Sequence, residues 1–472
     1  SVDGLEAFEK IAGELTTWLL LHEYDPNVNR ECSCGQGKCL VQCQDCHDFD
    51  ICCTECWLKR HVYNPWHWAR VWNGRFFVRS DISTLRQGGF TVQLGHHVHS
   101  NGVHGTLLSF CNCGSAQRVQ QLMRSRMFPA TTVEPETVFT FTMLREYDIQ
   151  ALQGQLPSYD WVHGLCRFTD NAHTHMVPDP YNPTIQAARV WRYIHDKLRS
   201  GEFYSLIPRT LPHLPPGTFI TRCAACPDPD INMEESWSET PKFLRHLIMM
   251  YTTLDGNCKT RRFQKQGDKF DFSLYKGRSY FPPNNEYSEF LEQAKKKKLV
   301  EPVPDCDSVK VITRLTDTAT HGMAVTGTVH HQCSHVLIMG VTDMFGSENQ
   351  ANVDAAFSRG YWLYGYEDKT IEQSSTRRKE VPHKQTYDAE CAYTVNQLIR
   401  FDIFEYLQRQ RDFVTRLEQG VPVVHLAGHK LLVCKILLAL FYHWCNGHFT
   451  GEGAEQAWPF MNRVATYSSQ AG

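Results

Sequence analysis

The sequence predicts a mixed α/β protein, α+β overall, in which a small metal-binding cysteine cluster and a mixed α/β middle segment precede an α/β core. Eight of its 19 cysteines fall between Cys32 and Cys56. After Trp237, strand-like stretches are followed by helix-like ones, a pattern typical of layered α/β and α+β domains. The 472 residues, 42% of them hydrophobic, suffice for roughly two to four domains. We expect four segments, spanning residues 1–30, 31–114, 115–240 and 241–472.

The first three segments carry different local patterns. Leu5, Phe8 and Ile11 recur at helical spacing and predict a helical lead-in over residues 1–30. The cysteine-rich segment contains the strand-like stretches "RVWNGRFFV" and "GTLLSFCNC". The middle segment holds two helix-like stretches, "AQRVQQLMRSRM" and "TIQAARVWRYIHDKL", and a proline-rich connector, "LIPRTLPHLPPG".

The fourth segment predicts strands first and a helix later. "LIMMYTTL" predicts a strand that emerges at Asp255 and continues into a hairpin, and "GMAVTGTVHHQCSHVLIMGV" predicts two more strands. "LLVCKILLALFYHWC" predicts a buried helix. This longest apolar run contains Lys435 and is too short to span a bilayer, so no membrane partner is expected.

Composition narrows the functional classes. The net charge of −3 gives no global sign of nucleic-acid binding, so any DNA contact must use local basic stretches. No charged region followed by an apolar stretch opens the chain, and clustered thiols in a reducing compartment bind metal more often than they form disulfides. The chain begins with Ser1, and we expect it to be a fragment of a longer protein.

The cysteine cluster has the spacing of zinc ligands. Zinc takes four tetrahedral thiolate or imidazole ligands, and each C-x2-C pair supplies two of them from one tight turn. We expect two structural zinc ions, held by Cys32, Cys34, Cys43, Cys46, Cys53, Cys56, His61 and His67. Cys39 and Cys52 are further thiols that leave the pairing partly open. The alternative, a set of buried free cysteines with two core histidines, does not explain the repeated C-x2-C spacing.

Later cysteines and histidines are less specific. Cys111 and Cys113 lie near four histidines of residues 96–104, where a further metal site and ordinary packing are both open. Cys223 and Cys226 form another C-x2-C that either completes a site across space or caps a turn. His425 and His429 lie four positions apart and could form a zinc site with Cys434 and Cys445, with ligands also from Cys333 and His335, or simply begin a helix.

Several motifs, taken in order, resemble one family of proteins. The run from Cys32 to Phe77 looks like the CxC-type cysteine cluster that accompanies the Kyakuja–Dileera–Zisupton (KDZ) transposases. "FCNCGSAQRVQQLMRSRMFPATTVEPETVFTF" and "YDWVHGLCRFTDN" are similar to the family's joining segment, and "CAACPDPDINMEESW" to its Cys-Pro motif. "LDGNCKTRRF", "TYDAECAY" and "GEGAEQAW" follow in the family's order.

The resemblance implies an RNase H-like core with three catalytic acids. The matching positions are Asp255, Asp388 and Glu455, with Glu452 as the close rival. Such acids would hold catalytic Mg2+ or Mn2+, because hard cations prefer carboxylate oxygens and a pair of them promotes phosphoryl transfer. The implied function is metal-dependent cleavage and transfer of DNA strands in the nucleus. Three further stretches also look like the family's: "HHQCSH" with Cys333 and His335, "GVTDMFGSENQANVDAAF" with Asp343 and Asp354, and "VPVVHLAGH" with His425 and His429.

Three departures from the family pattern keep a second function open. Cys258 follows "DGN" where the family usually has Phe. The stretch after Asp343 carries "SEN" where Gly-Glu-Arg is more typical. A polar stretch precedes Asp388 where a strand should lie. The alternative is a catalytically inactive, domesticated zinc-binding module associated with DNA or chromatin. A third hypothesis, a ubiquitin-ligase-like interaction device, does not need the large acid-bearing remainder.

The expected partner is double-stranded DNA, as transposon ends and target. The basic stretches "KTRRFQK", directly after Asp255, and "STRRKE", before Asp388, would contact phosphates. Aromatic residues of the cluster, from Trp57 to Phe76, either stack on bases or pack around the zinc module. The sequence leaves open the DNA ends recognised and the oligomeric state, and a homo-oligomer is compatible with it.

Overall fold

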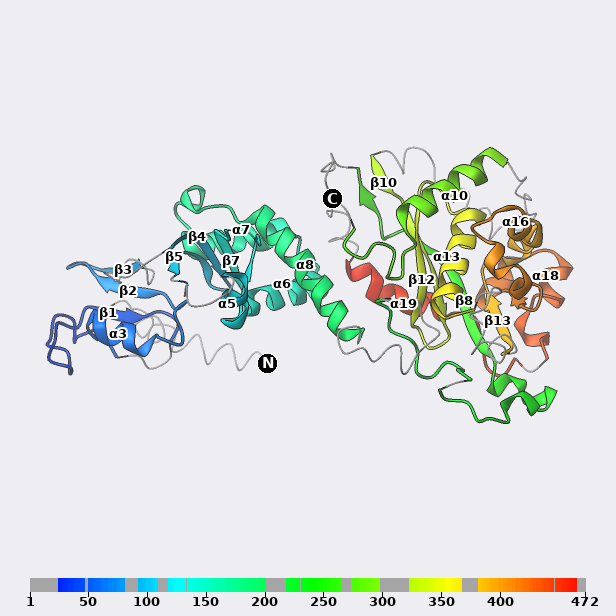
Figure 1. Cartoon of the computed structure of the whole chain (residues 1–472), viewed down its shortest axis with the longest axis horizontal. Helices are drawn as coiled ribbons and strands as arrows, with labels where there is room; N and C mark the ends of the chain where they lie inside the picture. Colours follow the sequence, from blue (N-terminus) through cyan, green and yellow to red (C-terminus); the bar gives the residue numbers. More distant parts are fainter. Residues whose placement is uncertain are drawn as a thin grey trace, which may run out of the picture. The chain divides into compact units, whose positions relative to one another are not determined.

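The computed structural model divides into two compact units (Figure 1), and each is described separately. Unit 1 comprises residues 1–148 and 158–188, and unit 2 comprises residues 149–157 and 189–472. The structure describes residues 24–46, 50–80, 92–108, 110, 118–132, 134–200, 218–229, 231–264, 273–297, 322–366, 381–444 and 446–464. The helix expected over residues 1–30 and the proline-rich connector fall mainly or wholly outside these ranges.

Unit 1 begins with a small three-stranded antiparallel sheet, ordered β1-β2-β3. Its strands are β1 (Val41–Cys43), β2 (Ala69–Trp72) and β3 (Phe77–Ser80), and the short helix α3 (Thr54–Arg60) follows Cys53. Trp57 of α3 is fully buried against Val41 and Ala69. The apolar cluster that supports this module is small, as in modules that need a bound metal to fold.

A four-stranded sheet, ordered β5-β4-β7-β6, forms the second part of unit 1. It consists of β4 (Val92–His99), β5 (Gly102–Leu108), β6 (Met127–Pro129) and β7 (Thr137–Thr140). This sheet joins strands from both sides of residue 114, where we expected a domain boundary. The helices along this stretch are α5 (Arg118–Arg124), α6 (Phe141–Gln153), α7 (Ser158–Thr169), the 3-10 helix η1 (Thr174–Met176) and α8 (Tyr181–Arg199).

Unit 2 is built on a five-stranded mixed sheet in the order β12-β11-β8-β13-β14. The central strand is β8 (Met250–Asn257), which pairs antiparallel with β11 (Gly327–Cys333) and parallel with β13 (His383–Thr386). The outer strands are β12 (Ile338–Met344), antiparallel to β11, and β14 (Glu418–Gly420), parallel to β13. The first three strands in sequence are therefore antiparallel neighbours, and the last two run parallel to the first.

Alternate side chains of β8 contact helices on opposite faces of the sheet, as the two-residue period of a strand requires. Thr252 hydrogen-bonds through its hydroxyl to that of Tyr361 on α13 (Gln350–Leu363), at 3.1 Å. Asn257 hydrogen-bonds instead to Asn462, just after α19 (Gly453–Met461). Both faces of the central strand are therefore covered.

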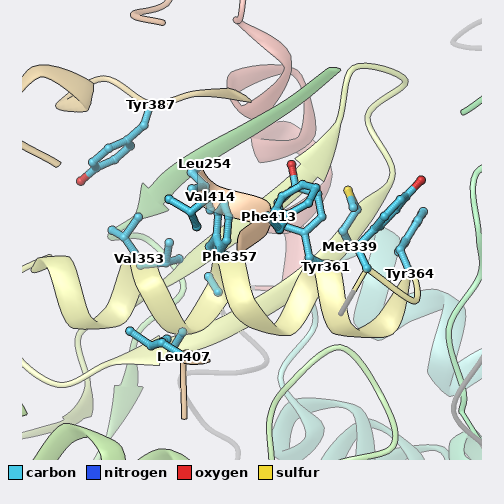
Figure 2. Packing of buried hydrophobic residues seen from close by; sticks show 14 of the residues in the cluster. Leu254, Met339, Val353, Phe357, Tyr361, Tyr364, Tyr387, Leu407, Phe413 and Val414 are labelled. Atoms are coloured by element: carbon cyan, nitrogen blue, oxygen red, sulfur yellow. The ribbon is translucent and has the colours of Figure 1, made fainter. Parts of the chain in front are cut away.

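Helix α13 packs closely along one face of this sheet. Figure 2 shows Val353, Phe357 and Tyr361 extending from α13 toward Leu254 of β8 and Phe413. A Cβ atom on Gly340 of β12 would lie only 2.6 Å from the backbone nitrogen of Gly360 in α13. The absence of a side chain at Gly340 therefore allows the helix to approach the sheet.

The remaining elements of unit 2 surround the sheet. They are η3 (Trp237–Glu239), η4 (Lys242–Leu247), β9 (Arg262–Phe263), α10 (Asn284–Lys297), β10 (Met323–Val325), α15 (Glu390–Tyr393), α16 (Gln397–Ile403), η5 (Gln408–Gln410), α17 (Arg411–Val414), η6 (Val424–Gly428), α18 (Leu432–Ile436), η7 (Leu440–Tyr442) and η8 (Asn462–Val464). Strand β9 pairs with β10 rather than returning along β8.

One sequence-based expectation for unit 2 was wrong, and one departure from the family pattern does not extend to the fold. "LLVCKILLALFYHWC" does not form one buried helix: it contains only the five-residue α18 and the turn η7, and Leu432 and Phe441 are exposed. The polar stretch before Asp388 does contain a strand: β13, "HKQT", pairs with β8 and β14, and its side chains are all buried. Polarity hid this strand, since its residues are central in the sheet and covered on both faces.

Among the helices in the described ranges, none combines the length and apolar character needed to cross a bilayer.

Candidate active site and metal-binding groups

Cys32, Cys34, Cys53 and Cys56 converge in the small module of unit 1. Their sulfur atoms all lie within 4.8 Å of one another. The Sγ atoms of Cys32 and Cys56 are 3.8 Å apart, and those of Cys34 and Cys53 are 3.5 Å apart. Zn–S bonds of about 2.3 Å place neighbouring sulfur atoms of a tetrahedron about 3.8 Å apart. The four thiols therefore fit one closed zinc site.

Cys43, Cys46, His61 and His67 form a second group of four. The Cys46 sulfur lies 3.4 Å from Nε2 of His61 and 3.2 Å from Nδ1 of His67. The Nδ1–H of His61 donates to the carbonyl oxygen of Trp57 at 2.9 Å, and its Nε2 faces the Cys46 sulfur. Such a backbone hydrogen bond is the usual means of orienting a ligating imidazole.

The two further thiols of the module belong to neither group. Cys39 and Cys52 are buried in the apolar cluster around Val41 and Trp57. Burial raises the pKa of both, to about 12 for Cys52, as for thiols that pack as small apolar side chains. All eight residues that we expected as ligands thus lie in two four-residue groups, and the donor sets are compatible with zinc.

The two aspartates expected at the catalytic site lie at one edge of the unit 2 sheet. Asp255 is near the end of β8, and Asp388 follows the end of the adjacent strand β13. Because these strands are parallel and adjacent, their carboxyl ends meet at the same edge. Thr386 of β13 pairs with Thr253 of β8, so Asp388 and Asp255, each two residues further on, lie side by side at this edge, and Asp255 is only 7% exposed.

The two glutamates come from the start of α19. Glu452 precedes the helix and Glu455 is in its first turn. His425 of η6 lies between the acids: its Nδ1 is 3.3 Å from Asp388, and its Nε2 is 3.6 Å from Glu455 and 3.9 Å from Glu452. Four carboxylates and one imidazole, from elements up to 200 positions apart in sequence, therefore gather at one site.

The glutamates differ in how they are held. Glu452 accepts a hydrogen bond from the backbone N–H of Val424 at 2.8 Å, and its side chain is 16% exposed. The side chain of Glu455 is 49% exposed, and its charge acts on both Asp255 and Asp388, whereas that of Glu452 acts on Asp388. Glu455 is therefore the freer carboxylate and the one coupled to both aspartates.

Burial and mutual repulsion disfavour the ionised forms of these acids. Burial, followed by the charges of Asp388 and Glu348, raises the pKa of Asp255 well above its ordinary value. Burial raises the pKa of Asp388 to about 6, although His425 acts in the opposite direction. A divalent cation would reverse this penalty, and buried carboxylates with raised pKa values are typical of functional sites.

Sequence analysis missed Glu348, which lies at the same edge. Its carboxyl group is buried, accepts a 2.7 Å hydrogen bond from the Tyr387 hydroxyl, and has a pKa raised by burial to about 7. A Cβ atom on Gly256 would lie 2.0 Å from Glu348 Oε2, so glycine at 256 is what admits this carboxylate. The available signal was the "SEN" stretch, whose central Glu348 stands where the more typical Gly-Glu-Arg also has its glutamate.

His425 and His429 do not share one site. The imidazole of His429 lies 3.5 Å from the Cys391 sulfur and forms a group of three potential ligands with Cys391 and Cys434. Its other ring nitrogen lies 3.0 Å from the backbone carbonyl oxygen of Asp388. The short η6 turns the two rings in different directions, which the four-residue spacing did not anticipate. Cys445 is outside the described residues.

The other expected metal positions have separate outcomes. Cys111 and Cys113 lie outside the described residues. His97 is fully buried and stacks on Trp66 at 3.4 Å, and His104 stacks on Trp68 at 3.9 Å, which is ordinary packing. Cys333 and His335 join Cys223 and Cys226 rather than His425.

The basic stretch after Asp255 is partly accessible. Lys259 and Arg261 are exposed, whereas Arg262 forms a 3.0 Å ion pair with Asp343. "STRRKE" lies outside the described residues. Trp57 and Trp68 are buried in unit 1, which favours packing over base stacking for these two rings, while Phe76 is 60% exposed.

Comparison with known families gave two matches. Residues 248–472 match the Kyakuja-Dileera-Zisupton transposase family, and residues 96–173 match a CxC2-like cysteine cluster associated with KDZ transposases. The second match begins within β4, after the eight zinc-type ligands, and covers the rest of the four-stranded sheet of unit 1. It therefore overlaps the expected cluster segment only over residues 96–114. No curated protein and no solved structure matched the chain.

Proposed function

This chain belongs to the KDZ transposases, and from that premise we propose that it is a DNA transposase whose unit 2 cleaves DNA strands and transfers them. The observation that carries the proposal is the gathering of Asp255, Asp388 and the α19 glutamates at one sheet edge. The strand order, three antiparallel strands followed by two parallel ones with the first acid on the central strand, supports an RNase H-like core.

The acid edge fits Mg2+ or Mn2+. Asp255, Asp388 and Glu455 would hold the ions, with Glu348 as a further buried carboxylate. Two such ions would activate the attacking oxygen of a phosphoryl transfer and stabilise the leaving one. Zinc at the two groups of unit 1 has a structural role, because four protein ligands leave no open position.

The chain's own residues prepare this chemistry in several ways. Tyr387 donates a hydrogen bond to Glu348 and fixes that carboxylate beside Asp255. The Val424 N–H holds Glu452, and His425 spans from Asp388 to Glu455. Lys259 and Arg261, a few residues beyond Asp255, would bind the phosphates of the DNA backbone. The proposed site of action is the nucleus, where the DNA partner lies.

A test of the proposal separates DNA cleavage from DNA binding. We expect the full chain to nick supercoiled plasmid DNA in the presence of Mg2+ and to lose this activity by about a thousandfold in Asp255→Asn, since one ligand of the metal pair contributes several kcal/mol. Glu292→Gln, a change of an exposed acid on α10, is the matched control and should retain full activity.

Binding of Mn2+ provides a readout that does not depend on the DNA sequence. Titration should show Mn2+ bound to the wild-type chain and to Glu292→Gln, and weakened in Asp255→Asn and Asp388→Asn. Salt-sensitive DNA binding without nicking, together with no Mn2+ binding, would instead support the inactive DNA-associated or chromatin-associated module. The sequence feature that favours this inactive module is Cys258, which follows "DGN" where the family usually has Phe.

A further inference from the structure

Cys223, Cys226, Cys333 and His335 converge in unit 2, away from the acid edge. Their ligand atoms all lie within 4.8 Å of one another, although the two pairs are 107 or more positions apart in the chain. The Cys226 sulfur is 3.6 Å from Nδ1 of His335. Zn–S bonds of about 2.3 Å and Zn–N bonds of about 2.1 Å place such atoms about 3.6 Å apart in a tetrahedral site.

The second pair is fixed by the β11–β12 hairpin. Cys333 is the last residue of β11 and pairs with Thr252 of the central strand. Its N–H donates to the carbonyl oxygen of Leu337 at 3.0 Å, and the N–H of Ser334 donates to that of Tyr251 at 2.9 Å. Val336 has a φ of 65°, which is rare for a β-branched residue, so this turn is held in a specific conformation.

The first pair sits on a loop that is stabilised independently. The Asn232 side-chain amide donates to the carbonyl oxygens of Ala224 and Cys226, at 3.0 and 2.7 Å. Arg222 forms a largely buried 3.0 Å ion pair with Asp228. These bonds hold the Cys-x2-Cys turn in a conformation that presents both cysteines as ligands.

The loop is anchored to the end of α13. The backbone N–H of Cys223 donates to the hydroxyl oxygen of Tyr364 at 3.3 Å, and the Arg222 guanidinium lies 4.8 Å from the centre of the Tyr364 ring. Both halves of the group are thus presented by well-bonded backbone, and neither depends on side-chain flexibility.

The donor set and the burial identify the ion. All three cysteines are buried and free, and the imidazole is on the exposed side, where an ion can enter. Three thiolates with one imidazole form a closed tetrahedral set typical of structural zinc. Along β11, Cys333 is three positions from His330, the partner of Asp255, which is about 10 Å of strand, so this group and the acid edge are separate sites.

We propose that Cys223, Cys226, Cys333 and His335 bind a structural zinc ion that ties the segment preceding β8 to the β11–β12 hairpin. The ion closes a loop of more than 100 residues within unit 2. It holds the segment that leads into β8 against the neighbouring strand β11. The zinc group lies near the start of β8, and the acids lie at the other end of that strand.

Counting zinc in the full chain tests the proposal. Cys226→Ser should lose one equivalent of zinc relative to the wild type, as measured by plasma mass spectrometry on the purified protein. His448→Ala, which removes an exposed histidine of unit 2 outside the group, is the control and should keep the wild-type count. An unchanged zinc count in Cys226→Ser would overturn the proposal.

A second pair of variants keeps the test decisive if Cys226→Ser does not fold. His335 is exposed, so its replacement leaves the buried part of the group intact. In His335→Ala, a competing chelator should remove one equivalent of zinc roughly tenfold faster or more, and His335→Cys should restore slow release. Equal release from all three proteins, or a Cys223–Cys226 disulfide in the purified chain, would contradict the assignment. None of these readouts requires DNA cleavage.

Discussion

The cysteine module of unit 1 and the acid edge of unit 2 gather ionisable side chains by opposite routes. In the module, eight ligands come from residues 32–67 and face one another across turns and one short helix. At the acid edge, Asp255, Asp388 and Glu455 are 133 and 67 positions apart and meet because two parallel strands and a helix end together. Local spacing alone forms the first site, and the topology of a sheet forms the second.

The two regions also differ in what supports them. The module has a small apolar cluster around Trp57, whereas unit 2 has an extensive core in which α13 covers the sheet. We therefore expect the module to depend on its metal for folding and the core to fold without metal at the acid edge. Each prediction below tests one side of this contrast.

The largest expected effect is loss of the module's fold. Cys43→Ser combined with Cys46→Ser removes two ligands of the second group, and apparent binding free energies of about 10 kcal/mol or more make such ions essential to small modules. We expect one equivalent of zinc to be lost and residues 24–80 to become sensitive to protease. Cys39→Ala with Cys52→Ala changes two buried thiols outside both groups and should keep the zinc count. Equal zinc loss in both double variants would refute the assigned ligand pairing.

In the core, a buried ion pair should matter more than an exposed one. Arg400 binds Asp354 through two contacts, of 2.6 and 3.0 Å, with side chains 4% and 1% exposed. Arg400→Ala leaves the carboxylate buried without its partner and should lower the free energy of unfolding by about 3–5 kcal/mol in urea denaturation. Arg411→Ala breaks an exposed pair with Asp402 and should change the free energy of unfolding far less, because solvent screens the pair. Similar losses of unfolding free energy in Arg400→Ala and Arg411→Ala would show that burial does not determine how much each ion pair contributes.

When no Mg2+ or Mn2+ is present, the free energy of unfolding of unit 2 should fall as pH rises, because the buried carboxyl groups of the acid edge ionise. Burial raises the pKa of Glu348 from 4.5 to about 7 in the folded state, so between these pH values the folded state binds more protons than the unfolded state. Stability therefore falls with rising pH across this window, by up to about 3 kcal/mol for Glu348. Urea denaturation at about pH 5 and about pH 7.5 measures the fall.

Glu348→Gln should reduce this pH dependence, and Glu292→Gln, on the surface of α10, should not. Added Mn2+ should oppose the fall in the wild type, because a bound cation favours the ionised carboxylates. A pH dependence unaffected by Glu348→Gln would mean that another group is responsible.

The smallest effect distinguishes the two glutamates of α19. Glu455→Gln should reduce Mg2+-dependent plasmid nicking by about a hundredfold, since its charge acts on both aspartates, whereas Glu452→Gln should reduce it by about tenfold through loss of the bond to Val424. Single-turnover rates at saturating DNA provide the comparison. The reverse order would make Glu452 the catalytic carboxylate.

The extent of prediction from sequence follows the same contrast. The closely spaced cysteine and histidine pairs identified all eight candidate ligands of the module, because such ligands are neighbours in sequence, but sequence could not show which thiols pack as apolar side chains. The family motifs named Asp255, Asp388 and the glutamates, and the strands β8, β11 and β12 were expected from their apolar patterns. Strand β13 was expected only from the family resemblance, because its buried side chains are polar, and "LLVCKILLALFYHWC" was mistaken for a buried helix.

The sequence by itself determined the chemistry available to this protein: clustered thiols and imidazoles for zinc, and widely spaced acids in the order of the KDZ motifs. Only the tertiary structure decided the partners. It placed Glu348 over Gly256, separated His425 from His429, and joined Cys223 and Cys226 to Cys333 and His335. The physical reason is that side-chain type sets what a residue can bind, whereas strand pairing and helix packing set which residues, however distant in the chain, come within a few ångströms of it.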